Sequence, residues 1–231
     1  MSTLLLRLAA PLQAWGLESK FERRGTMREP TKSGVVGLLA AALGRGRDES
    51  VADLAQLRYG VRIDQPGKLL RDYHVARGEK TAIYVTERYY LADAVFLAGF
   101  EGDEELLNEL DCALKNPAYP LYLGRRSCPP EGQITLGLRG LPLEQALIAE
   151  EWKAGNWLKL HAPDSVSLTL VVDADKPGML RRRDYPVSFS RKRREFTFRY
   201  VEDRVNLVQY KDTITPDSYS TDHDPFTELG G

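Results

Sequence analysis

A short loop before a helical pattern carries a concentration of positive charge. Residues 23–33 (RRGTMREPTKS) contain four bases, Arg23, Arg24, Arg28 and Lys32. The Pro30-Thr31 pair predicts a helix start at Lys32. Backbone N–H groups and the dipole at such a start favour a phosphate, and the hydroxyls of Thr31 and Ser33 add donors. An ordinary helix cap with solvated arginines is the alternative interpretation.

A second loop mixes aromatic, glycine and arginine residues. Residues 119–130 read YPLYLGRRSCPP. Gly124 allows a polyanion to approach the backbone, Tyr122 offers a stacking face, and Arg125 and Arg126 offer forked contacts to phosphates or bases. Recognition of single-stranded RNA typically uses such aromatic and guanidinium planes. A surface turn whose arginines pair with nearby acids is the alternative.

The third cluster is Arg71-Asp72-Tyr73-His74. A tyrosine and a histidine together suit metal-independent acid–base chemistry on a ribose 2'-OH. Adjacent residues of a strand point to opposite faces, however, so Tyr73 and His74 do not converge on one atom. We therefore expect this cluster to contact RNA or a neighbouring protein without catalysis.

The histidines and cysteines predict no metal or cofactor. Two cysteines and three histidines supply no zinc site at the usual ligand spacing, and no Ser/His/Asp arrangement is apparent. Cysteine content also excludes a disulfide framework and favours the cytoplasm. No apolar stretch is long enough to span a membrane or resembles a signal peptide.

Charge is balanced overall but uneven along the chain. The 231 residues contain 32 Lys and Arg against 33 Asp and Glu, a formal net charge of -1. Residues 181–199 hold eight bases against two acids, a balance of +6, whereas residues 200–231 hold two bases against seven acids, a balance of -5. The neutral total therefore does not exclude a polyanionic partner.

The order of predicted elements favours an α+β fold. Strands are expected at residues 3–9, 59–64, 94–100 and 133–138, with helices at 32–43, 50–57 and 103–114. This order predicts a ferredoxin-like or RRM-like domain over residues 1–145. Residues 71–92 predict a protruding β-hairpin with a turn at 78–80. After a helix at 143–152, strands near 165–172 and 195–201 predict a smaller β-rich domain over residues 150–231.

Four motifs together resemble a known family. PLQAWG at 11–16, PTKSGVVGLLAAALG at 30–44, RDYH at 71–74 and YLGRRSCP at 122–129 are similar in order and spacing to the Cas5 family of the RAMP superfamily. The similarity lies with the CasD branch, found in type I-E CRISPR Cascade complexes. It covers most of residues 1–140, and weak similarity extends beyond residue 150.

The resemblance implies a non-catalytic RNA-binding subunit that caps the 5' handle of the crRNA in antiviral defence. It also implies that residues 71–92 form a thumb packed against the adjoining Cascade backbone subunit. The large subunit lies beside it, and target DNA is nearby through the complex. The RNA contacts expected from the loops and the resemblance are Gln13, Trp15, Arg23, Arg24, Arg28, Lys32, Ser33, Arg71, Tyr73, His74, Tyr122, Gly124, Arg125, Arg126 and Ser127. For Trp15 the alternative is a core residue at the sheet edge.

Two other functions remain open from sequence. One is a metal-independent endoribonuclease that processes CRISPR repeat RNA. The related type I-C branch does this with a Tyr, Lys and His set, whereas RDYH resembles the non-cleaving branch. The other is a protein-binding scaffold whose arginines meet acidic neighbours.

Overall fold

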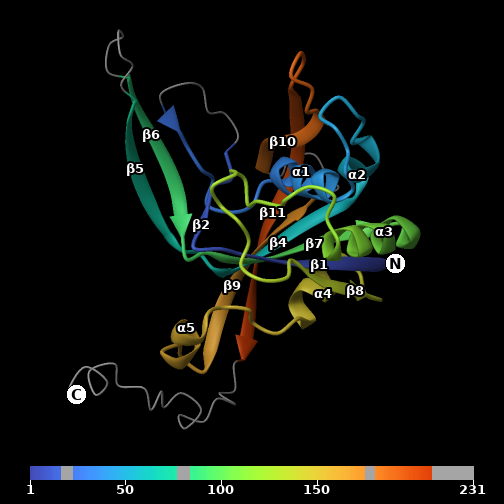
Figure 1. The fold of residues 1–231 in the computed structure, drawn as a ribbon. Coiled ribbons are helices and arrows are strands. Elements are labelled where there is room, and N and C mark those ends of the chain that lie inside the picture. Colours follow the sequence, from blue (N-terminus) through green and yellow to red (C-terminus); the bar gives the residue numbers. More distant parts are fainter. Residues whose placement is uncertain (17–22, 77–83, 175–179, 210–231) are drawn as a thin grey trace, which may run out of the picture.

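A seven-stranded antiparallel sheet organises the chain. The computed structural model describes residues 1–16, 23–76, 84–174 and 180–209. Along the sheet the strand order is β10-β11-β9-β4-β7-β1-β8 (Figure 1). The strands are β1 (Ser2–Ala9), β4 (Arg58–Gln65), β7 (Val95–Gly102), β8 (Thr135–Arg139), β9 (Ser165–Asp173), β10 (Leu180–Ser188) and β11 (Glu195–Gln209). The chain is thus a mixed α+β protein.

Helices cover both faces of this sheet. They are α1 (Lys32–Ala42), α2 (Ala52–Gln56), α3 (Glu104–Lys115), α4 (Leu143–Ala149) and α5 (Asn156–Leu160). Leu4, Leu6 and Leu8 of β1 pack into the larger core with α1 and α3, whereas Leu5 packs with α4. This division follows from the alternation of side chains along a strand. Figure 1 shows α1 and α3 on one face and α4 on the other.

A second, smaller sheet carries the expected hairpin. It contains β2 (Leu12–Gln13), β3 (Arg23–Arg24), β5 (Lys68–Ala76) and β6 (Tyr84–Ala92). Strands β5 and β6 are antiparallel, from Lys68 opposite Ala92 to Ala76 opposite Tyr84. The hairpin stands away from the helices (Figure 1). The turn expected at 78–80 lies outside the described residues.

The C-terminal strands extend the same large sheet. Strand β9 pairs with β4 from Gly60 opposite Val172 to Ile63 opposite Thr169. The sheet therefore continues across the domain boundary expected near residues 145–150. Strand β10 was not among the expected elements, because its inward-facing positions are charged: Arg182 and Asp184 break the apolar alternation that marks a strand.

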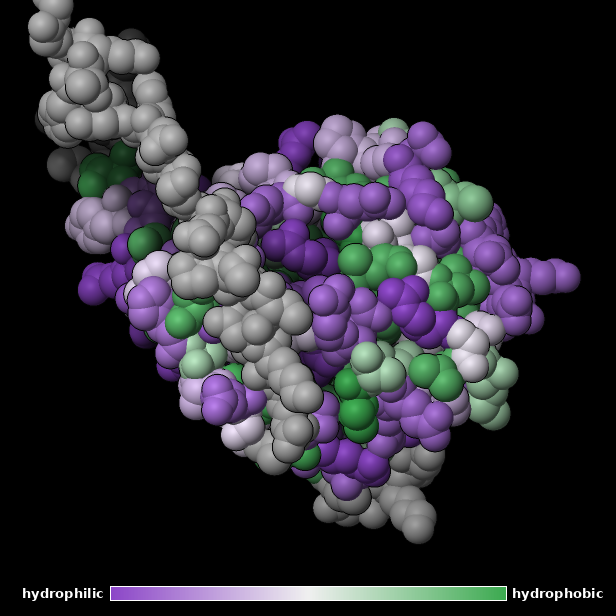
Figure 2. All heavy atoms as spheres, turned by 90° about the horizontal axis from the view of Figure 1, so that it is seen from below, coloured by the Kyte–Doolittle hydropathy of each residue, from purple (hydrophilic) through white to green (hydrophobic). Residues whose placement is uncertain are grey.

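On the face seen from below, apolar side chains form separate patches among polar ones (Figure 2).

Within the described ranges the longest helix, α3, has 12 residues, and none of the helices there has the length and apolarity to cross a bilayer.

Candidate nucleic-acid interface

Arg125 joins the two basic loops that the sequence keeps far apart. Its Nη2 donates to the backbone oxygens of Arg24 at 2.8 Å and Gly25 at 3.2 Å. The Arg125 guanidinium also lies 4.6 Å from the ring centroid of Tyr90 on β6, which is cation–π distance. The loop at 119–130 is therefore fixed against β3 and β6.

Gly124 makes this close approach possible. Its φ is +86°, and a Cβ built there would lie 1.7 Å from the carbonyl oxygen of Ala14. The Ala14 N–H donates to the Leu123 oxygen at 3.2 Å, and the Leu123 N–H donates to the Cys128 oxygen at 2.8 Å. Only glycine fits here, since any side chain would meet backbone. Gly124 thus allows the loop at 119–130 to pack directly against residues 13–15.

Gln13 and Trp15 are buried, which corrects the expectation that they contact RNA. Their relative exposures are 0% and 1%. Gln13 Nε2 donates to the oxygens of Leu8 and Ala94, and its Oε1 accepts from Trp15 Nε1 at 3.0 Å. The Trp15 backbone bonds to Thr26 and Met27. Trp15 is a core residue, the alternative kept open above, and the pair holds the start of the basic loop in place.

The start of α1 is already occupied by a carboxylate, which corrects the expected phosphate site. Thr31 caps the helix by accepting from the Gly34 N–H at 3.2 Å. Asp184 on β10 accepts the Lys32 backbone N–H at 2.8 Å and two bonds from Arg199. Because Asp184 supplies the negative charge that the helix dipole favours, a phosphate has no place there.

Lys32 and Ser33 are also withdrawn from the surface, at 3% and 7% exposure. Lys32 Nζ forms an ion pair with Asp173 at 2.9 Å. Burial lowers the pKa of Lys32, against the opposing effect of Asp173. These two residues belong to the junction of α1 with β9 and β10, which corrects the expectation that they contact RNA.

Four arginines of the two loops, Arg23, Arg24, Arg125 and Arg126, are called here the basic cluster. Arg23 Nη2 donates to the Tyr89 hydroxyl at 3.2 Å and its guanidinium lies 5.3 Å from that ring. Arg23, Arg24 and Arg126 are exposed, as are the nearby chain positions Arg28, Gly124 and Ser127, while Tyr122 is half-buried. Two of these guanidinium groups, those of Arg23 and Arg125, lie beside tyrosine rings, and exposed guanidinium and aromatic groups together suit phosphates and stacked bases.

Sequence reasoning missed the contribution of β6 to this surface. Arg24 pairs with Arg88 in a parallel ladder, and among described atoms Arg88 Nε and Arg125 Nη1 are buried without a hydrogen-bond partner. Burial acts to raise the pKa of Tyr90, but hydrogen bonds with Ser127 and Arg125 outweigh it and the pKa lies below its usual value. The alternating charges and tyrosines of residues 84–90 were the signal that could have revealed it.

The RDYH residues lie on β5, the outer strand of the hairpin. Tyr73 is opposite Glu87 and His74 is opposite Thr86, so the two side chains point to different faces. His74 Nε2 lies 2.5 Å from Asp72 Oδ2, and Arg71 forms an ion pair with Glu87. The structure does not bring Tyr73 and His74 together on one reacting atom. Tyr73 remains 58% exposed.

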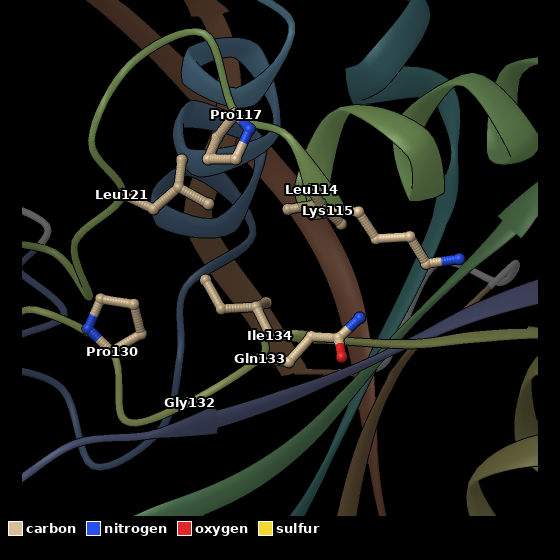
Figure 3. A pocket seen from close by; sticks show the side chains of 8 residues that line it. All are labelled: Leu114, Lys115, Pro117, Leu121, Pro130, Gly132, Gln133 and Ile134. Atoms are coloured by element: carbon tan, nitrogen blue, oxygen red, sulfur yellow. The ribbon is translucent and has the colours of Figure 1, made fainter.

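A cavity of about 450 Å³ with both apolar and polar lining lies beside residues 119–130, called here the arginine loop (Figure 3). It lies between the end of α3 and residues 117–134, and no expected site residue lines it. Its lining residues are Leu114, Lys115, Pro117, Leu121, Pro130, Gly132, Gln133 and Ile134.

Nearby in sequence, burial raises the pKa of the Cys128 thiol. Across the described residues, no group of three His, Cys, Asp or Glu side chains is placed to hold a metal ion.

Comparison with known proteins identifies the family. The profile of the CRISPR-associated protein family described as Cas_Cas5 matches residues 3–202. The chain belongs to the Cas5 family. This Cas5 chain is 36% identical over 202 residues to the CRISPR system Cascade subunit CasD of Escherichia coli (strain K12), covering 73% of the chain and 90% of that relative.

Two solved structures resemble this Cas5 chain over most of its length. One, titled as the crystal structure of a Cas protein, is 44% identical with a TM-score of 0.70, covering 88% of this chain and 94% of the other. The second, a chain of a CRISPR RNA-guided surveillance complex, is 30% identical with a TM-score of 0.75, covering 89% and 90%.

Proposed function

We propose that this Cas5 protein is a non-catalytic, RNA-binding subunit of a type I-E CRISPR Cascade complex, and that its basic cluster holds the 5' handle of the crRNA. The single observation that supports the handle site is the pair of hydrogen bonds from Arg125 to the backbone oxygens of Arg24 and Gly25. It makes one surface from two loops. The similarity to a Cascade subunit and to a chain of an RNA-guided complex supports the assembly.

The mechanism is electrostatic contact plus stacking. Arg23, Arg24 and Arg126 are exposed and neutralise handle phosphates. Arg125 holds its loop against the backbone of Arg24 and Gly25. Tyr122 and Tyr89 offer faces to splayed bases. Binding by these contacts requires no metal or acid–base chemistry. Such a complex acts in the cytoplasm, where RNA and invading DNA meet.

The fold supports this role. The central strands have the order β8-β1-β7-β4 with antiparallel neighbours, which is the ferredoxin-like order. We therefore assign residues 1–145 to an RRM-like domain and the later strands to its β-rich extension. The β5–β6 hairpin is inserted between β4 and β7 and exposes Leu69, Tyr73 and Val75 at 50%, 58% and 55%. This apolar row suits a thumb packed on the backbone subunit, with the large subunit and target DNA nearby.

The test of the handle site replaces Arg24 and Arg126 with alanine. Both are exposed, so the fold should be unaffected, whereas Arg125 also positions its loop. We expect weaker crRNA retention in the assembled complex and a salt slope reduced by about 0.7 for each phosphate that is no longer neutralised. Arg47→Ala, also exposed, is the matched control. A double variant that assembles with unchanged RNA content and affinity would show that the site is elsewhere.

Cleavage of repeat RNA is tested separately. Incubation of the pure protein with labelled CRISPR repeat RNA in EDTA should leave the RNA intact, because Tyr73 and His74 lie on opposite faces of β5. Site-specific cleavage that disappears in His74→Ala would replace this proposal with an endoribonuclease.

A further inference from the structure

A row of aromatic rings lies on strand β11, outside the basic cluster. Phe196, Phe198 and Tyr200 occupy alternate positions of one continuous strand, so they share a face with a spacing of about 6.8 Å. Phe198 is 50% exposed, whereas Arg199 between the rings is 7% exposed and points into the core. Phe198 therefore lies on the side of β11 opposite Arg199, and the Phe196 ring packs edge-on against Phe189 with the centroids 6.2 Å apart.

Two arginines lie over these three rings. The Arg181 guanidinium lies 4.4 Å from the Phe198 centroid and 6.0 Å from that of Tyr200. The Arg194 guanidinium lies 5.1 Å from the Phe196 centroid. Arginine stacked on an aromatic ring keeps its N–H donors free at the rim of the plane, where phosphate and base edges can be reached.

The turn between β10 and β11 adds further positive charge. Arg191, Lys192, Arg193 and Arg194 are all exposed, and the acid nearest in sequence, Glu195, is paired with Arg193 at 2.9 Å. With Arg181 these are five bases against two acids, Glu195 and Glu202, the next alternate position of β11 after Tyr200. Glu202 pairs with Arg204 at 3.0 Å. The segment thus combines a basic turn with aromatic planes.

Buried hydrogen bonds on the other side of β10 and β11 hold the aromatic rings and the basic turn in a fixed position. Arg199 on β11 donates two hydrogen bonds to Asp184 on β10, at 2.6 and 2.9 Å, and a third to Asp173 on β9. Three strands are thereby tied beneath the ring face. A preorganised surface loses less conformational freedom on binding.

We infer that this surface, defined as Arg181, Arg191, Lys192, Arg194, Phe196, Phe198 and Tyr200, is a second binding site for single-stranded nucleic acid. Bases stack on the aromatic and guanidinium planes and phosphates pair with the basic turn. An acidic protein surface would use the charges but not the exposed ring face. The site lies on a different sheet from the basic cluster: β10 and β11 end the seven-stranded sheet, whereas β3 and β6 belong to the smaller one.

The test uses the full chain and a fluorescein-labelled 20-nucleotide oligo(dT) strand, measured by anisotropy at low salt. The background carries Arg24→Ala and Arg126→Ala, so that the basic cluster contributes little. We expect Phe198→Ala to raise Kd about tenfold and Phe198→Trp to restore binding. Replacing Arg191, Lys192 and Arg194 with alanine should reduce the salt slope by about 2. Trp157→Ala and Arg47→Ala, both exposed, are the matched controls.

Three outcomes would overturn the inference: no binding by the background chain, equal weakening in the Trp157→Ala control, or tighter binding of a 20-base-pair duplex than of the strand. Loss of a protein subunit from the assembled complex, with strand affinity unchanged, would assign the surface to an acidic protein instead. The crRNA content of the assembled complex is measured in parallel. If the handle site is wrong, the crRNA content of the complex does not change when Arg24 and Arg126 are replaced. Phe198→Ala still weakens the binding of the oligo(dT) strand in that case.

Discussion

At the scale of single residues, several charged side chains serve the fold. The side chains of Asp184 and Arg199 are 2% and 6% exposed. The backbone N–H of Lys32 donates a hydrogen bond to Asp184. Removing one member of a buried ionic group leaves the others without compensation, which costs far more than the group contributes when complete. Sequence reasoning assigned Lys32 to RNA because a lysine next to a helix start gives no local sign of burial.

Asp184→Ala should lower the free energy of unfolding by about 3–5 kcal/mol, because Arg199 then loses two hydrogen bonds inside the protein. Urea unfolding followed by circular dichroism measures it. Asp48→Ala, at an exposed position, is the control. Equal stability of both variants would contradict the structural role of Asp184.

Glu150 should make stability depend on pH. Burial acts to raise its pKa, but hydrogen bonds from Lys153 and Arg139 outweigh this and the pKa lies below the usual value. A lowered carboxyl pKa stabilises the fold above roughly pH 4.5 and loses that contribution as pH falls through the folded-state value. Unfolding free energies between about pH 3 and 6 should therefore rise with pH, with a smaller rise in Glu150→Gln. An identical profile in the variant would exclude this assignment.

At the scale of elements, the arginine loop depends on glycine geometry as much as on charge. Gly124 and Gly132 both have positive φ, but only Gly124 meets backbone; nothing lies within 4 Å of a Cβ at Gly132. The loop composition signals RNA binding, whereas the contact with Ala14 decides where its arginines lie. The same holds for the β5–β6 hairpin. Its residues predict a protruding element, but only the pairing of β3 with β6 brings β6 next to Arg23 and Arg24.

Gly124→Ala should reduce crRNA retention more than Gly132→Ala does. Both substitutions strain the backbone, by about 1 kcal/mol or somewhat more, but the first also pushes the loop off Ala14 and moves Arg125. Filter binding of handle RNA, together with thermal unfolding, separates the two effects. If both variants retained equally little RNA, strain alone would account for the loss and the Ala14 contact would have no special part.

At the scale of the whole molecule, one sheet links both halves of the chain. Strand β9 is hydrogen-bonded to β4 along four residue pairs, and Val171 and Val201 belong to the same core as Leu4 and Val35. The overall charge of -1 hides the basic surfaces because acids elsewhere in the chain cancel them. The net charge of the whole chain therefore does not show whether it binds RNA.

A chain ending at residue 150 should therefore fail to fold stably, since it exposes the edge of β4 and removes the β9 side of the core. The full chain should unfold in a single transition, seen at the same urea concentration by tryptophan fluorescence and circular dichroism. Two separate transitions, or a cooperative fragment of residues 1–150, would instead indicate independent domains.

The local elements and the family motifs could be predicted from the amino-acid sequence alone. Apolar periodicity placed β1, α1 and α3 within one or two residues of their bounds, because side-chain spacing follows directly from strand and helix geometry. Which charged side chains are accessible to a partner depends on contacts between residues far apart in the chain. Arg125 meets Arg24 across 101 positions and Asp184 meets Lys32 across 152. Such long-range pairing leaves no local periodic pattern, so burial of Gln13, Lys32 and Ser33 and the inward charges of β10 required the folded chain.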